Sequence, residues 1–194
     1  MSDAVKGKAY AIGLRDVVFA PFAPDPTSGL YLPPVKLSES LTAGITPNFT
    51  ITTLYADDRA VAVASALGDI DIQLTISDLS DADYDLLMGT KKNTDGVIED
   101  DIDDVAPYGA LGFRLPLEGG GFRYYWYYKG KFQPPALTHN TKGGGVEFQS
   151  PAISGKFMAR DDGKWRSRLT HIGTAANAVA TAWLTEVYEP TPAI

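Results

Sequence analysis

The strongest constraint on the fold is an uninterrupted alternation of polar and apolar side chains over residues 69–76, which read Asp-Ile-Asp-Ile-Gln-Leu-Thr-Ile. A period of two residues is that of a β-strand with one face in water and the other in a core. The segment therefore predicts a strand that places Asp69 and Asp71 on the polar face.

A second β-element is predicted where residues 113–117 and 122–128 flank a glycine-rich turn at 118–121. Glycine supplies the positive φ that such a reversal needs, so the segment predicts a hairpin. Both faces of its second strand carry aromatic side chains: Phe122, Tyr124, Trp126 and Tyr128 on one, Arg123, Tyr125, Tyr127 and Lys129 on the other. Such a strand is either central and packed on both sides, or presents one face to another subunit, where Tyr and Trp are enriched.

Further strands are predicted at residues 146–157 and 165–169, on either side of the turn Asp161-Asp162-Gly163. Asp-Gly between two apolar runs is a hairpin signal. The chain is therefore expected to be mainly β.

Two helices are expected beside these strands. Ser80, with Asp83 three residues later and Gly89 as a stop, predicts a short helix that begins with a capping box. Apolar side chains at helical spacing predict a C-terminal helix over about 175–187, which begins after Thr174 and ends before Pro190.

Residues 55–67 fit neither pattern and are expected to form an extended loop or arm. Small apolar residues follow a charged group there, and long loops in small domains usually have a function; a plain surface loop remains the alternative. The residues through which such an arm would contact a partner are Tyr55, Asp57, Asp58, Arg59, Val61 and Val63. Residues 1–194 show no internal repeat and no domain boundary, so we expect a single domain.

Composition limits the functions open to the chain. Its formal net charge of -7 is opposite in sign to the basic surface that tight nucleic-acid binding requires. Without cysteine it has no disulfide, thiolate metal site or cysteine nucleophile. No stretch approaches the roughly 20 apolar residues that span a bilayer. We therefore expect a chain made in the cytoplasm with no membrane segment.

The sequence contains no recognisable catalytic or cofactor-binding pattern. His139 and His171 lie about 30 residues apart, outside any triad or metal motif. The acidic run at 99–104 does not match the EF-hand spacing and is most simply a solvated turn. We predict no catalytic residues, no metal site and no cofactor, while a remote carboxylate pair stays compatible with an enzyme.

The order of several segments resembles the major tail protein family of long-tailed bacteriophages with non-contractile tails. The resemblance covers nearly the whole chain and is carried by the ordered set rather than by any one piece. These segments are residues 12–21 (IGLRDVVFAP), 54–58 (LYADD), 66–68 (ALG), 106–113 (APYGALGF), 124–132 (YYWYYKGKF), 141–143 (TKG), 146–151 (VEFQSP) and 187–190 (VYEP).

The resemblance implies a β-sandwich or barrel-like tail-tube fold with a flanking helix, similar to the tube protein of type VI secretion systems. It implies a structural protein of the virion tail, not an enzyme, whose hexameric rings stack into a tube around a DNA channel. Expected partners are further copies of the chain and the tape measure, tail-tip and tail-terminator proteins, while DNA passes without specific binding. Residues 55–67 would reach the next ring, and Asp69 and Asp71 are candidates for the lumen; the alternative is that they face outside solvent.

Two other functions remain open. One is a different component on the same fold, such as a tail terminator. The other is a monomeric carbohydrate-binding β-sandwich, which would need an exposed aromatic platform such as Tyr125, Tyr127 and Trp165.

Overall fold

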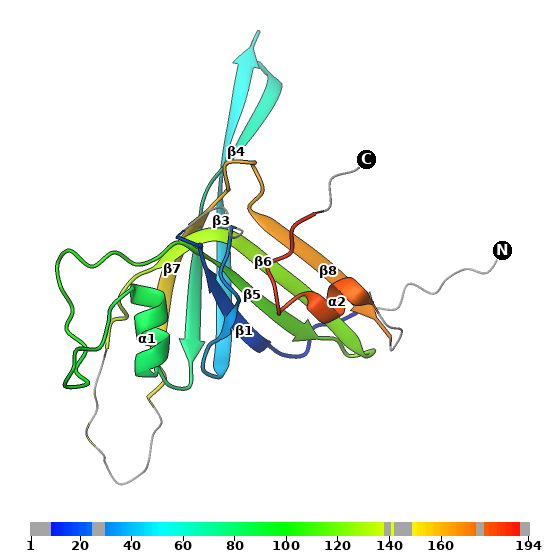
Figure 1. The fold of residues 1–194 in the computed structure, drawn as a ribbon. Coiled ribbons are helices and arrows are strands. Elements are labelled where there is room, and N and C mark those ends of the chain that lie inside the picture. Colours follow the sequence, from blue (N-terminus) through cyan, green and yellow to red (C-terminus); the bar gives the residue numbers. More distant parts are fainter. Residues whose placement is uncertain (1–8, 25–29, 138–140, 142–148, 174–176, 191–194) are drawn as a thin grey trace.

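The computed structural model describes residues 9–24, 30–137, 141, 149–173 and 177–190 (Figure 1). The described chain is mainly β and forms one antiparallel, open sheet with two short helices. In chain order the elements are β1 (Arg15–Pro21), β2 (Val35–Lys36), β3 (Ser40–Ala56), β4 (Arg59–Ile76), α1 (Asp81–Met88), β5 (Gly109–Pro116), β6 (Gly121–Phe132), β7 (Ala152–Met158), β8 (Arg166–Ile172) and α2 (Ala178–Ala182).

The eight described strands belong to one sheet. Its strand order is β2-β1-β5-β6-β7-β4-β3, and β8 pairs with β6. Consequently β6 carries β7 on its C-terminal part and β8 on its N-terminal part, both antiparallel to it. β3 and β8 each have an unpaired edge in the described chain.

The prediction of a hairpin around Asp161-Asp162-Gly163 is wrong, although both flanking strands exist. β7 and β8 do not pair with each other, because both pair with the long strand β6 in succession. Gly163, with φ 79°, closes a tight turn in which the Gly163 amide donates to the Arg160 carbonyl. The turn moves the chain from the β4 side of the sheet to its edge. The predicted strand 146–157 begins at Ala152, and residues 142–148 lie outside the described chain.

The main core lies on one face of the sheet, and the predicted alternation supplies a large part of it. Ile70, Ile72, Leu74 and Ile76 are buried there, whereas Asp69 and Asp71 are on the opposite face. β1, β5, β6 and β7 contribute side chains to the same cluster, and α1 adds Leu87 and Met88. Burial of this apolar surface is the main source of stability.

Helix α1 begins and ends where the sequence predicts. The Ser80 hydroxyl accepts a hydrogen bond from the Asp83 amide, and Gly89 has a left-handed conformation with φ 78°. The buried Asp83 carboxylate also accepts hydrogen bonds from Ser38 and Ser80. α1 is therefore tied to the segment that precedes β3.

A second cluster on the other face of the sheet lies under α2 and the residues that follow it. Tyr124, Trp126 and Tyr128 of β6 pack there against Trp183 and Val187. Because Tyr127 and Phe132 of β6 lie in the main core, β6 is packed on both faces within the chain. The structure therefore supports the central-strand interpretation of its aromatic residues.

The C-terminal helix is much shorter than the expected 175–187. It spans Ala178–Ala182, and its cap is Asn177, whose side chain accepts from the Ala180 amide; residues 174–176, including Thr174, lie outside the described chain. The Trp126 indole donates to the Trp183 carbonyl at 2.8 Å. That bond holds the carbonyl toward the sheet, and the chain continues as a turn.

No helix among the described residues is long and apolar enough to cross a membrane.

Candidate functional site

The residues expected to form an arm lie in a β-hairpin rather than a loop. The ends of β3 and β4 project beyond the rest of the sheet and form the cyan hairpin at the top of Figure 1. Its turn is Asp57-Asp58, with φ of 51° and 58°. Two positive φ values are typical of the two-residue turns that match strand twist, and Asp tolerates them better than most residues.

The alternation of inward- and outward-facing residues shifts by one position where the hairpin leaves the core. Pro47 pairs with Ile70 but Phe49 pairs with Leu67, so Asn48 lies opposite both Gly68 and Asp69. This bulge brings Leu67, rather than its neighbours, onto the core face, where it packs against the main core. The sequence carries the same signal, since the bulky apolar residues of 61–67 lie at odd positions (Val61, Val63 and Leu67), whereas those of 70–76 lie at even positions.

The core face of the hairpin therefore continues outward beyond Leu67 as a largely apolar strip, and in the described part of the chain its side chains Phe49, Ile51 and Val63 are exposed. We call this strip the arm face; the register gives it Phe49, Ile51 and Thr53 from β3 and Val63, Ser65 and Leu67 from β4. Ile51 and Val63 are 67% and 66% exposed. Near the turn Leu54, Tyr55 and Val61 are exposed as well. Apolar surface of this extent on a projecting element is typical of an interaction site.

Strand β3, which is 17 residues long, pairs only with β4 in the described part of the chain, so its other edge is free there. Such an edge presents unpaired backbone amides and carbonyls that can pair with another strand. Pro47 lies within it, a residue tolerated on edge strands because it has no amide hydrogen to donate. The edge and the arm face are thus two interaction-competent features of one hairpin.

The two lumen candidates lie together on the polar face of the sheet. The Asn48 side-chain amide donates to Asp69 at 3.0 Å and to Asp71 at 2.8 Å, and Lys156 forms ion pairs with both carboxylates. The hydrogen bond from Lys156 is the main cause that lowers the pKa of Asp69, and that from Asn48 the main cause for Asp71.

This polar face is less acidic than the composition predicts. Lys131 lies beside Lys156 on it, because the two residues are cross-strand partners. Two ammonium groups thus accompany the carboxylates of Asp69 and Asp71. Next to them is a shallow hollow of about 340 Å³, lined by Gly44, Gln73, Ser154 and Gly155 among others.

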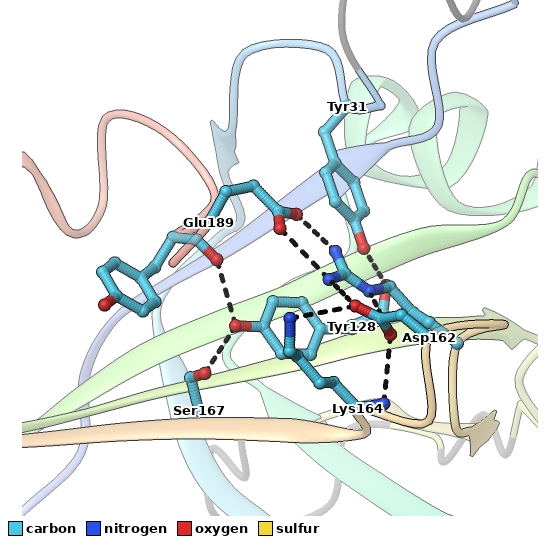
Figure 2. Close-up of polar contacts among 8 residues, drawn as sticks. Tyr31, Tyr128, Asp162, Lys164, Ser167 and Glu189 are labelled. Atoms are coloured by element: carbon cyan, nitrogen blue, oxygen red, sulfur yellow. Dashed lines mark hydrogen bonds and ion pairs between the residues drawn. The ribbon is translucent and has the colours of Figure 1, made fainter. Parts of the chain in front are cut away.

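A polar cluster that the sequence does not reveal fastens the C-terminal segment (Figure 2). Arg160 lies between Glu189 and Asp162 and forms ion pairs with both. Burial alone would lower the pKa of Arg160, but hydrogen bonds with these carboxylates raise it above its ordinary value. The hydrogen bond from Arg160 in turn holds the pKa of Asp162 well below its usual range.

Two tyrosines complete the cluster. The Tyr31 hydroxyl donates to the Tyr128 carbonyl at 2.8 Å, and the Tyr128 hydroxyl donates to the Tyr188 carbonyl at 3.0 Å. Burial raises the pKa of Tyr31 to about 12. Tyr31 and Tyr128 lie 97 positions apart in the sequence, and no local pattern joins them.

Among the described residues there is no group of three or more His, Asp or Glu side chains arranged to hold a metal ion. His171 lies on β8 opposite Phe122, and His139 is outside the described chain. The aromatic platform of the carbohydrate-binding alternative is only partly exposed, because Tyr127 is buried and the half-buried Tyr125 and Trp165 pack against the main core.

No model of a known protein family matches the chain, and no curated protein matches it.

Proposed function

We propose that the chain is a structural, self-assembling protein: the tail-tube subunit of a long-tailed, non-contractile bacteriophage. In this proposal hexameric rings of the subunit stack head to tail around a DNA-conducting channel, and the chain has no enzymatic activity. Its other partners are the tape measure, tail-tip and tail-terminator proteins of the same virion. The proposal combines the resemblance of the ordered sequence segments with the assembly features of the β3–β4 hairpin.

The observation that carries the proposal is the uncovered arm face. Ile51 and Val63 stay about two-thirds exposed although the same strands bury their neighbours nearer the core. At roughly 25 cal/mol per Å², covering such a strip on a second copy would favour association substantially. In this proposal the arm, which projects away from the sheet (Figure 1), meets a surface of the next copy other than that copy's own arm. Contacts of that heterologous kind close into rings or grow into tubes.

The open edges of β3 and β8 also support the proposed ring, because each can pair with a strand of a neighbouring subunit. A neighbour that pairs with such an edge satisfies its backbone groups and removes an aggregation hazard. The face that carries Asp69 and Asp71 then becomes the candidate channel wall. Its near balance of positive and negative groups suits DNA that must move without being retained.

The test is negative-stain electron microscopy of the purified chain over a range of concentrations, together with light scattering for mass. We expect rings or hollow tubes. Compact monomers at every concentration, also in the presence of the cognate tail-tip initiator, would refute the proposal.

Two neighbouring substitutions make the test specific to the arm face. Val63→Asp places a charge on the arm face, whereas Ala64→Asp places the same charge one residue away on the opposite face of the hairpin; both positions are exposed. We expect Val63→Asp to abolish tubes while the folded monomer keeps its melting temperature. Ala64→Asp should assemble far better. Equal loss in both variants would show that the arm face is not the contact.

A further inference from the structure

A group of arginines stands out on the sheet because the chain as a whole is acidic. Arg166 and Arg168 project from β8, beside Arg123 of β6, and register places all three on the face that bears the main core. Tyr125 and Trp165 lie partly buried among them, and the Arg166 guanidinium lies 4.4 Å from the centre of the Trp165 ring. We call these five residues the arginine surface.

No carboxylate pairs with these arginines in the described part of the chain. Arg123 donates to the Ala9 carbonyl, and its Nε is buried without a hydrogen-bond partner. By contrast, Arg114, Lys156 and Arg160 all form ion pairs with aspartate or glutamate. The arginine surface therefore has unused positive charge around an apolar centre.

The complementary pattern occurs on the segment between α1 and β5. Residues 99–104 contain five carboxylates around a single apolar residue, Ile102, which is 98% exposed. These carboxylates form no ion pair with a described lysine or arginine. Asp100 accepts a hydrogen bond from the Tyr84 hydroxyl at 3.0 Å, Glu99 accepts one from the Asn93 side chain, and two of the others accept from amides of the segment itself. The segment thus presents an apolar tip surrounded by negative charge.

The two surfaces lie on opposite sides of the subunit. In Figure 1 the green segment that contains residues 99–104 runs beside α1 on the left, whereas β8 forms the right-hand edge. One chain cannot bring them together, but two copies placed side by side can. In such a pair the carboxylates of one copy attract the arginines of the other, and Ile102 contacts Tyr125 and Trp165. Two acidic segments would repel each other, so a pairing through two acidic sides is excluded.

We propose that the acidic segment 99–104 of one copy binds the arginine surface of the next copy, with Ile102 against the half-buried aromatics and the carboxylates against Arg166 and Arg168. This inference rests on the proposed function and assigns its lateral, side-by-side contact. The contact is heterologous, so each subunit uses both surfaces at once and a ring can close.

Charge exchange tests the contact in the full-length chain. Arg168 is the suitable arginine, because Arg166 also stacks on Trp165, and Asp103 is its counterpart in the acidic segment. Sedimentation velocity should show that Arg168→Glu and Asp103→Lys each weaken self-association about tenfold, and that the double variant returns to within about threefold of the wild type. Both residues are exposed, so melting temperatures should stay unchanged.

Crosslinking supplies an independent readout, since the chain contains no cysteine. Copies with Ile102→Cys and copies with Arg168→Cys, mixed and treated with a short bismaleimide, should give a mixed dimer in high yield. Copies with Thr46→Cys, exposed on the other face of the sheet, replace Arg168→Cys as the control and should give little product.

The outcomes separate this inference from the proposed function. Rings or tubes that form unchanged in both charge variants would overturn the lateral contact and leave the tube proposal standing. A wild-type chain that stays monomeric, together with Ile102→Cys and Arg168→Cys copies that give no mixed dimer, would overturn both. If Arg168→Glu abolishes binding of a DNA duplex and leaves self-association intact, the arginine surface serves nucleic acid and the inference is wrong.

Discussion

Arg160 and Glu189 form an ion pair that joins the turn after β7 to the C-terminal segment (Figure 2). The pair lies at the end of the segment that covers Trp126 and Tyr128, the second hydrophobic cluster of the sheet. The position of α2 over the sheet therefore depends on an interaction between residues 29 positions apart.

Removing the Glu189 charge should destabilise the fold. Glu189→Gln leaves Arg160 paired with Asp162 alone, and hydrogen bonds to charged groups contribute about 1–2 kcal/mol each after exposure is taken into account. We expect a loss of about that size in the free energy of unfolding, measured by urea denaturation. Glu186→Gln, an exposed change in the same segment, is the control and should be nearly neutral; a loss of equal size there would contradict the role of the ion pair.

Stability should fall in acid partly through Asp162. Its pKa is held well below the ordinary value of about 3.9 by Arg160, so the folded state keeps this carboxylate ionised where the unfolded state takes up a proton. The contribution is complete above that ordinary pKa and is lost as the pH falls through the folded-state pKa. Urea midpoints at pH 7 and pH 3 should therefore differ less in Asp162→Asn than in the wild type. An unchanged difference would contradict the assignment.

The two lumen candidates should respond differently to loss of their neighbours. Lys156 is the main cause that lowers the pKa of Asp69, and Asn48 is the main cause for Asp71. Carboxyl-carbon NMR titrations should show that Lys156→Met raises the pKa of Asp69 more than that of Asp71. Asn48→Ala should show the reverse order, and identical shifts in both variants would contradict the hydrogen-bond assignments.

Gly130 should not tolerate a side chain. A Cβ built there would lie 2.2 Å from the Phe157 ring, inside the main core. Overpacking of this kind costs about 1–3 kcal/mol, so Gly130→Ala should lower the melting temperature markedly. Gly119→Ala is the matched control, because nothing lies within 4 Å of a Cβ at that position.

The sequence determined the elements whose signals are local. The alternation of residues 69–76, the Ser80 cap with its Gly89 stop, and the hairpin around residues 118–121 all appear where they were predicted. Each depends on side chains within a few positions of one another. Periodicity, capping and turn chemistry act at that range and can be read directly.

The pairing of distant strands could not be predicted from the sequence in the same way. The Asp161-Asp162-Gly163 turn has the residues of a hairpin. However, β6 is long enough to pair with β7 and β8 in succession, so these two strands pair with β6 and not with each other. The shift in alternation at Gly68 was present in the sequence, yet its partner Asn48 and its effect on the arm face depend on the register of β3.

The sequence by itself determined a mainly β chain, the faces of its clearest strand and the limits of its first helix. Only the tertiary structure decided where the C-terminal helix ends, because the Trp126 indole donates a hydrogen bond to the Trp183 carbonyl. Only the tertiary structure decided which residues pair with Arg160. The physical reason is separation along the chain: local preferences act through neighbouring residues, whereas hydrogen bonds and packing between distant segments exist only after the sheet has brought them together.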